Sequence, residues 1–224
     1  MRRSTVPLAG LAVITLFGIM LSGSRFGAPA GRDLAPAVLP VPSAKQQVAT
    51  FAGGCFWSMQ KAFDGVPGVV STTAGYSGGT VTQNVTYEEV ETGRTGHAES
   101  VQLIYDPAQI SYERLLDIYW HHIDPLTPDR AFCDHGPQYR SIIFYRDPEQ
   151  QRLAEASKRA LDQSHRFPTP IVTAIQPATK FYPAEEYHQL FYKKNPARYE
   201  AYRIGCGRDQ RTRELWGDVA VGAH

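Results

Sequence analysis

The GGCFW segment at residues 53–57 has the clearest capacity for chemistry in this sequence. A β-prone run, residues 47–52, ends at its two glycines, and the residues after it have helical spacing. Cys55 is therefore expected in the first turn of a helix, where free backbone N–H groups and the helix dipole favour a thiolate. This segment alone leaves two interpretations open, a nucleophilic thiol and a buried structural cysteine, since free cysteines are commonly buried.

Acidic and phenolic residues stand close to other predicted strands. Glu99 begins one strand, and Asp134 and Tyr139 lie in the loop that precedes another. Taken singly, Glu99 would be an ordinary solvated strand residue and Tyr139 an ordinary half-buried strand-edge tyrosine, so only the joint pattern carries a functional prediction.

The cysteines limit the redox chemistry that this chain can perform. There are three, Cys55, Cys133 and Cys206, and no two of them have CxxC spacing. This argues against a thioredoxin-type motif and a zinc ribbon, and the scattered His and Asp residues also lack metal-ligand spacing. An odd number leaves at least one thiol unpaired within the chain, or all three in exchange.

The composition indicates one domain of ordinary size. The chain has 224 residues, a formal net charge of +1, 20% charged residues and 42% hydrophobic residues. Charges of both signs are mixed along the chain, which gives no indication of a nucleic-acid partner.

The N-terminus resembles an export signal. Arg2 and Arg3 precede an apolar run at residues 6–21, and a small-x-small cleavage site follows at residues 28–30. We expect residues 1–30 to be a signal peptide, with an uncleaved anchor as the alternative, and the protein to be exported. A Pro/Ala-rich linker at 31–46, a catalytic domain at 47–217 and a tail at 218–224 complete the predicted organisation.

Hydrophobic periodicity and turn residues predict alternating strands and helices. The expected strands are residues 47–52, 69–74, 99–105, 141–145 and 171–175. The expected helices are residues 55–64, 111–120, 148–164 and 184–194. This order predicts an α/β (α+β) sandwich, a mixed sheet with a split βαβ, ferredoxin-like core covered by helices. From Gly205 onward we expect a coil wrapped over the domain.

Several motifs in order resemble the A-type peptide methionine sulfoxide reductases. They are the GCFW segment, the HAE segment at 97–99, the GPQYRS segment at 136–141 and the FYPAEEYH segment at 181–188. The similarity runs from about residue 50 to residue 216, nearly the whole predicted domain. It implies an enzyme that reduces methionine S-sulfoxide, free or protein-bound, to methionine.

The resemblance also implies roles for individual residues. Cys55 matches the nucleophile that attacks the sulfoxide sulfur, and Glu99 matches the general acid that protonates its oxygen. Tyr87 and Tyr139 match phenols that hydrogen-bond this oxygen, and Asp134 matches a polar partner in the same network. A further pair, Phe56 and Trp57, matches the aromatic pocket for the substrate's methyl group.

Cys206, which lies between two glycines, matches a resolving cysteine of the family. It would condense with the sulfenic acid left on Cys55, and a thioredoxin-like reductant would then recycle the enzyme. Two alternatives stay open, namely a structural disulfide between Cys206 and Cys133, and Cys133 as the resolver. Oxidised proteins or peptides are the expected substrates, no cofactor is implied, and we expect a monomer.

Two other functional classes remain as alternatives. A cysteine hydrolase or transpeptidase would need Cys55 activated by His97, His121 or His188, although no orienting residue follows a recognisable order. A non-catalytic exported module that captures oxidised methionine would make Cys55 a structural thiol. A metal protein is the least favoured class.

Overall fold

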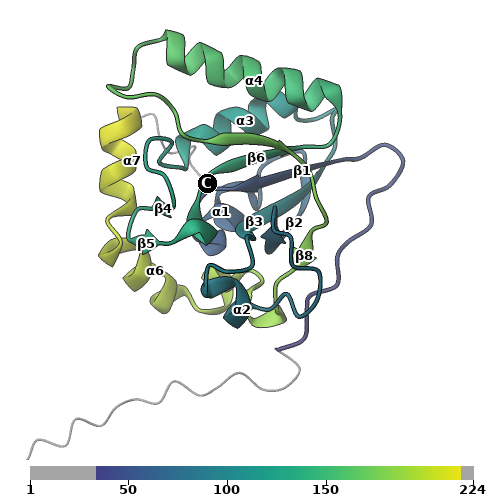
Figure 1. Ribbon diagram of the computed structural model, residues 1–224. Helices are drawn as coiled ribbons and strands as arrows, with labels where there is room; N and C mark the ends of the chain where they lie inside the picture. Colours follow the sequence, from purple (N-terminus) through teal and green to yellow (C-terminus); the bar gives the residue numbers. More distant parts are fainter. Residues whose placement is uncertain (1–33, 218–224) are drawn as a thin grey trace, which may run out of the picture.

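The computed structural model describes residues 34–217 (Figure 1). The predicted signal peptide at 1–30 and the predicted tail at 218–224 lie outside these residues. Within residues 34–217, no helix has the length and apolar character needed to cross a membrane. Part of the predicted linker packs on the domain, because Pro36 forms an antiparallel bridge with Glu185.

A six-stranded sheet with the order β7-β6-β1-β3-β2-β8 forms the centre of the domain. Its strands are β1 (Gln47–Ala52), β2 (Val69–Ser77), β3 (Ala98–Tyr105), β6 (Ile142–Tyr145), β7 (Ala174–Pro177) and β8 (Tyr182–Pro183). β3 lies antiparallel between β1 and β2, and β6 is antiparallel to β1. This confirms the split βαβ, ferredoxin-like core. At the edges, β7 runs parallel to β6 and β8 antiparallel to β2.

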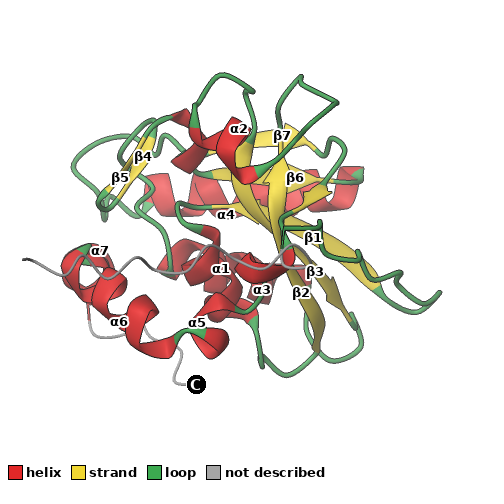
Figure 2. Ribbon diagram, turned by 90° about the horizontal axis from the view of Figure 1, so that it is seen from below, coloured by secondary structure: helices red, strands yellow, loops and turns green. Residues whose placement is uncertain are grey.

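Helices and short segments complete the domain. The helices are α1 (Phe56–Phe63), α2 (Tyr87–Glu91), α3 (Tyr112–His121), α4 (Pro148–Gln163), α5 (Phe191–Lys194), α6 (Pro196–Gly205) and α7 (Arg208–Trp216). A two-stranded hairpin is formed by β4 (Arg130–Ala131) and β5 (Asp134–His135), and 3-10 turns cover Pro137–Tyr139 and Glu186–His188. Figure 1 shows α3 beside α4, and Figure 2 shows α5, α6 and α7 following one another past α1.

Helix caps fix where two of the helices begin. The Ser111 side chain accepts a hydrogen bond from the backbone N–H of Arg114, and the Asp147 side chain accepts one from Gln150. Pro148 follows at the first position of α4, where a missing N–H costs nothing. Both predicted helix starts are confirmed.

An aromatic cluster anchors β1 just before the glycine turn. The Phe51 ring stacks on the rings of Phe63, Tyr112 and Tyr119, with centroids 5.4, 6.0 and 5.0 Å away. The Tyr119 hydroxyl donates a 2.9 Å hydrogen bond to the backbone carbonyl of Ala52. The last residue of β1 is therefore held from the α3 side, which fixes the point where the chain turns toward Cys55.

The predicted helix at 184–194 is wrong. The segment instead contains the 3-10 turn, then Leu190 in the left-handed region with φ 50°, and only then α5. Side-chain amides replace the helical hydrogen bonds, because Gln60 accepts from the Leu190 N–H at 2.8 Å and Gln189 bonds both backbone groups of Ala74 at 2.9 Å. Tertiary partners thus outweigh the local periodicity.

The predicted C-terminal coil is also wrong, since the chain there forms the end of α6 and then α7. The buried positions of α7 are Arg208, Thr212, Leu215 and Trp216. They have helical spacing, but two of the four are polar, so a hydrophobic pattern alone does not reveal them. Arg208 donates to the backbone carbonyls of His122 and Gly53, which ties α7 to the glycine turn.

Candidate active site

The site begins at the turn between β1 and α1. Gly54 has φ +86°, and a Cβ there would lie 2.5 Å from the Ala131 Cβ, so both the conformation and the space require glycine. Cys55 is the N-cap of α1, and its carbonyl accepts the N–H groups of Ser58 and Met59 at 3.1 and 3.2 Å. The predicted position of Cys55 at the first turn of a helix is confirmed.

The Cys55 thiol is more deeply buried than its helix position alone implies, with 6% of its surface exposed. Burial raises its pKa well above the ordinary value, and the nearby carboxylates of Glu99 and Asp134 raise it further. Hydrogen bonding by Tyr202 and by the Trp57 backbone opposes this rise. Our expectation of a lowered pKa is therefore wrong for the resting site, because desolvation and like charge outweigh the helix terminus.

Glu99 lies beside the nucleophile. Its Oε2 accepts a 2.9 Å hydrogen bond from the backbone N–H of Phe56, the residue after Cys55, and only 3% of its surface is exposed. Burial raises its pKa to about 8; Asp134 and Glu91 add to the rise, and the hydrogen bond from Phe56 opposes it. A carboxyl with this pKa keeps its proton at neutral pH and is able to act as a general acid.

A pocket of about 330 Å³ opens at this point. Its lining residues are Cys55, Phe56, Trp57, Tyr87, Glu91, Glu99, Asp134, Tyr139, Arg198 and Tyr202. Every site residue predicted from the sequence is in this set except Cys206. The sequence reasoning missed Glu91, Arg198 and Tyr202, since Glu91 and Arg198 are exposed charges and Tyr202 lies in a segment without a recognised motif.

The two predicted phenols reach the pocket from different elements. Tyr87 is the first residue of α2, and its backbone N–H donates to Glu185 at 2.9 Å. Tyr139 ends the 3-10 turn that precedes β6. Burial raises the pKa of both hydroxyls, and the Glu99 charge raises them further. Both groups therefore stay protonated and are available as hydrogen-bond donors to an oxygen in the pocket.

Aromatic rings form one wall of the pocket. The Trp57 ring stacks on Phe191 with centroids 3.8 Å apart, and its indole N–H donates a 3.0 Å hydrogen bond to Nδ1 of His188. The His188 ring also packs against those of Phe56 and Tyr87. Burial lowers the pKa of His188 to about 3, so the ring is neutral and can accept this bond. The FYPAEEYH motif at residues 181–188 ends at His188, but the sequence did not predict that His188 would accept the Trp57 hydrogen bond.

The histidines that a hydrolase would need have other partners. Nδ1 of His97 accepts the Gly79 N–H at 3.1 Å, and the His121 ring contacts the Asp117 carbonyl at 2.7 Å. His188 Nδ1 accepts the Trp57 N–H, and its Nε2 is buried without a hydrogen-bond partner, so within the described residues none of the three histidines is hydrogen-bonded to Cys55 as the base of a triad would be.

A disulfide joins Cys133 to Cys206, and Cys55 is the free cysteine. The bond links the turn between β4 and β5 to the C-cap of α6, across 73 residues of sequence. The pairing left open as an alternative to Cys55–Cys206 is thus the one present in the structure. Asp134, next to Cys133, accepts a 2.6 Å hydrogen bond from the Tyr202 hydroxyl.

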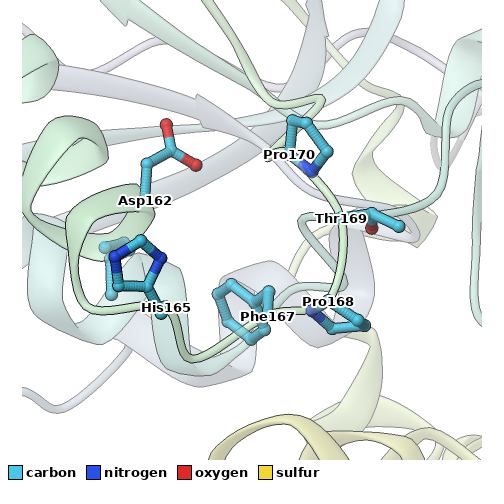
Figure 3. A pocket seen from close by; sticks show the side chains of 7 residues that line it. Asp162, His165, Phe167, Pro168, Thr169 and Pro170 are labelled. Carbon is cyan, nitrogen blue, oxygen red and sulfur yellow. The ribbon is translucent and has the colours of Figure 1, made fainter.

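A second pocket of about 300 Å³ lies at the end of α4 and in the loop after it. Figure 3 shows Asp162 and His165 on the helix side and Phe167, Pro168, Thr169 and Pro170 along the loop. Asp162 accepts a weak 3.4 Å hydrogen bond from the Ile171 N–H. The pocket has no cysteine in its lining, so it does not share the chemistry of the Cys55 pocket.

Fold and site together define an α+β domain that holds a buried free cysteine at the N-terminus of a helix, with a buried carboxyl beside it. The family described as peptide methionine sulfoxide reductase matches residues 47–220. The chain belongs to this family, and it is an oxidoreductase that reduces methionine sulfoxide.

Individual relatives agree with this identification. The chain is 54% identical over 169 residues to a peptide methionine sulfoxide reductase of Halalkalibacterium halodurans, covering 75% of this chain and 96% of the relative. It is 51% identical over 175 residues to the Bacillus subtilis enzyme, covering 78% and 98%.

Two solved structures show the same fold. Mxr1 from Saccharomyces cerevisiae in its reduced form has a TM-score of 0.65 and 32% identity, covering 73% of this chain and 93% of that one. Methionine sulfoxide reductase A of Corynebacterium diphtheriae has a TM-score of 0.61 and 31% identity, covering 75% and 91%.

Proposed function

We propose that Cys55 attacks the sulfur of methionine S-sulfoxide while Glu99 protonates its oxygen. The observation that carries this assignment is the 2.9 Å hydrogen bond from the Phe56 N–H to Glu99, which holds a buried carboxyl beside the nucleophile. A sulfoxide oxygen is a poor leaving group until it is protonated. Since burial raises the pKa of Glu99 to about 8, the carboxyl carries the required proton at neutral pH.

The reductive step needs no reagent besides thiol and sulfoxide. The Cys55 thiol loses its proton, and its sulfur attacks the sulfoxide sulfur as Glu99 delivers a proton to the oxygen. The oxygen ends on Cys55 as a sulfenic acid, the thioether methionine leaves, and the proton from the thiol restores Glu99. A protonated Glu99 carries no charge and therefore does not repel a thiolate on Cys55. One of the causes that raise the pKa of Cys55 is then absent.

Tyr87 and Tyr139 hold the sulfoxide oxygen in this proposal. Both line the pocket, and both hydroxyls stay protonated because their pKa values are raised. Asp134 accepts the Tyr202 hydroxyl proton at 2.6 Å, which fixes that hydroxyl beside Cys55 in the pocket lining. These donors would stabilise the charge that develops on the oxygen in the transition state.

Phe56 and Trp57 form the subsite for the substrate's methyl group. Phe56 is 1% exposed and Trp57 is fixed between Phe191 and His188, so the two rings present a rigid apolar surface beside Cys55. Contact between sulfur or its methyl group and aromatic rings is favourable. On the basis of the family resemblance, we also propose that the enzyme reduces the S epimer of methionine sulfoxide, both free and protein-bound.

The catalytic cycle closes by thiol exchange. Cys206 condenses with the sulfenic acid of Cys55 and releases water, and a thioredoxin-like dithiol reduces the resulting disulfide. We propose that the enzyme is exported, acts as a monomer and needs no cofactor. Export rests on residues 1–30, and the mass of the mature N-terminus in the native host would test it.

Turnover of each sulfoxide epimer, first with dithiothreitol and then with thioredoxin, tests the function directly. We expect the S epimer of methionine sulfoxide to be reduced with both reductants and the R epimer with neither. Reduction of the R epimer at a comparable rate would contradict the proposed stereochemistry. Absence of reduction with dithiothreitol for both epimers would contradict the roles given to the pocket.

A further inference from the structure

A third pocket, of about 500 Å³, lies between α1 and the C-terminal helices α5, α6 and α7 (Figure 2). It shares no lining residue with the Cys55 pocket, because residues 55–57 line that pocket and α1 residues from Ser58 onward line this one. Five cationic side chains and two carboxylates face it. The cationic side chains are Lys61, Lys193, Arg203, Arg208 and Arg213.

Ion pairs within the chain neutralise three of these cations. Lys193 pairs with Asp64, and Arg203 pairs with Asp209 at 2.9 Å, which uses both carboxylates of the pocket. Lys61 pairs at 3.3 Å with a glutamate of α6. The two remaining arginines of the pocket, both in α7, have no carboxylate within ion-pairing distance among the described residues. The pocket therefore carries a positive charge that the described chain does not balance.

Arg208 is the buried member of this pair, with 7% of its surface exposed. Its guanidinium donates to the backbone carbonyls of His122 and Gly53 at 3.2 and 3.3 Å, and it lies 4.1 Å from the centre of the Phe132 ring. Its Nε is buried and has no hydrogen-bond partner among the described residues. A buried cation is normally paired with an anion, because burial without a partner is costly. An anion from solution would supply the missing partner.

Other groups of α7 favour an anion at the same place. Thr212 lies one helical turn after Arg208, is also 7% exposed, and its hydroxyl makes no hydrogen bond within residues 34–217. Gly207, the N-cap of α7, has no side chain to cap the first N–H groups, so the positive end of the helix dipole adds to the potential. Arg213, on the next turn, is exposed and lies at the rim.

We propose that this pocket binds the phosphate group of a small molecule, with Arg208 and Thr212 as its inner contacts and Arg213 at the rim. A guanidinium fork matches two phosphate oxygens, and a hydroxyl donates to a third. The volume is that of a small-molecule site and exceeds the needs of a bare ion. The rings of Tyr192 and Tyr199 also line the pocket and offer an apolar surface to the rest of a phosphate monoester.

Isothermal titration calorimetry of the full chain tests this proposal with three probes at constant ionic strength. The probes are phenyl phosphate, inorganic phosphate and phenol. We expect both phosphates to bind with a stoichiometry of one, and phenol not to bind. Phenyl phosphate binding about tenfold more tightly than inorganic phosphate would identify a monoester as the ligand, since the ring adds contacts. Equal affinity of the two would identify the free ion.

Single substitutions locate the site. Thr212→Val keeps the shape of the side chain and removes a hydroxyl without a partner, so the fold should be kept and the Kd should rise about tenfold. Arg213→Gln removes an exposed cation at the rim and should raise the Kd about threefold. Arg159→Gln is the matched control, because it removes one exposed cation from α4, outside the pocket, and should keep the wild-type Kd. Thermal unfolding without phosphate checks the fold of each variant.

Three results would overturn the proposal. The first is the absence of binding by either phosphate below about 10 mM, or binding of phenol as tight as that of phenyl phosphate. The second is a wild-type Kd in both Thr212→Val and Arg213→Gln, which would place the phosphate elsewhere. The third is displacement of phenyl phosphate by methionine S-sulfoxide, which would place it in the Cys55 pocket.

Discussion

The backbone N–H of Phe56 donates a hydrogen bond to the carboxyl of Glu99 over 2.9 Å, joining the first residue of α1 to the second residue of β3. This bond connects the two halves of the proposed chemistry, because Cys55 directly precedes Phe56. It also fixes the acid relative to the nucleophile through the backbone, which is stiffer than a contact between two flexible side chains.

Cys55→Ser should abolish sulfoxide reduction with every reductant. A hydroxyl is a far weaker nucleophile toward sulfur than a thiol, and no other described cysteine is free. Steady-state assays with dithiothreitol and with thioredoxin measure this, and thermal unfolding shows that the variant is folded. More than a few per cent of wild-type activity would remove Cys55 from its role.

Glu99→Gln should slow the reductive step strongly while the fold is kept. The amide keeps the shape of the carboxyl but cannot deliver a proton, and general acid catalysis contributes about 10²–10⁴-fold. Single-turnover release of methionine is the relevant measurement, since recycling does not limit it. A rate within about threefold of wild type would show that another group supplies the proton.

The rate of the reductive step should fall above about pH 8. Glu99 reacts in its protonated form, and burial raises its pKa from 4.5 to about 8. Above that pH, each further unit lowers the protonated fraction about tenfold. Single-turnover rates between pH 6 and 10 would show this limb in wild type, and Glu99→Gln would lack it. A wild-type profile without an alkaline limb would contradict the assignment.

The same titration predicts a change in stability. Between about pH 4.5 and 8 the folded state keeps a proton on Glu99 that the unfolded state has lost. The stabilisation is complete below that window and is lost as the pH rises through it, so the free energy of unfolding falls. Denaturant titrations of wild type should show this fall relative to Glu99→Gln. Parallel pH dependences in the two proteins would speak against a buried, protonated Glu99.

Cys206→Ser should separate chemistry from recycling. Cys55 can still attack, so a first equivalent of methionine should form at a normal rate, while thioredoxin-driven turnover collapses because the sulfenic acid lacks its partner. Dithiothreitol should sustain part of the activity, since a small thiol can reach the pocket. A purely structural disulfide predicts the opposite pattern, a loss of about 2–5 kcal/mol of stability with thioredoxin turnover intact.

Gly54→Ala should damage both stability and activity. Gly54 has φ +86°, and an added Cβ would lie 2.5 Å from that of Ala131, so strain and overlap combine. We expect a loss of about 2–4 kcal/mol and a lower single-turnover rate, because the turn that places Cys55 must shift. Gly65→Ala is the matched control, with φ +82° and no atom within 4 Å. Equal losses in the two variants would leave strain alone as the cause.

Local patterns in the sequence determined much of the fold. The glycine turn before Cys55 and the caps at Ser111 and Asp147 depend on residues a few positions apart, and the strands of the ferredoxin-like core follow from short apolar runs. Motif order was equally informative for the pocket, since it predicted the nucleophile and most of the pocket lining. These features were predictable because each motif or cap is encoded within a short stretch of chain.

Only the tertiary structure decided the electrostatics and the cysteine pairing. The sequence places Cys55 at a helix terminus, which favours a thiolate, but Glu99 and Asp134 come from distant elements and join burial in raising its pKa. Cys133 meets Cys206 across 73 residues, and two of the four buried positions that hold α7 are polar, so a hydrophobic pattern does not mark this helix. Desolvation and charge depend on every group that the fold brings within a few ångströms, whatever its place in the chain, so residue spacing alone does not report them.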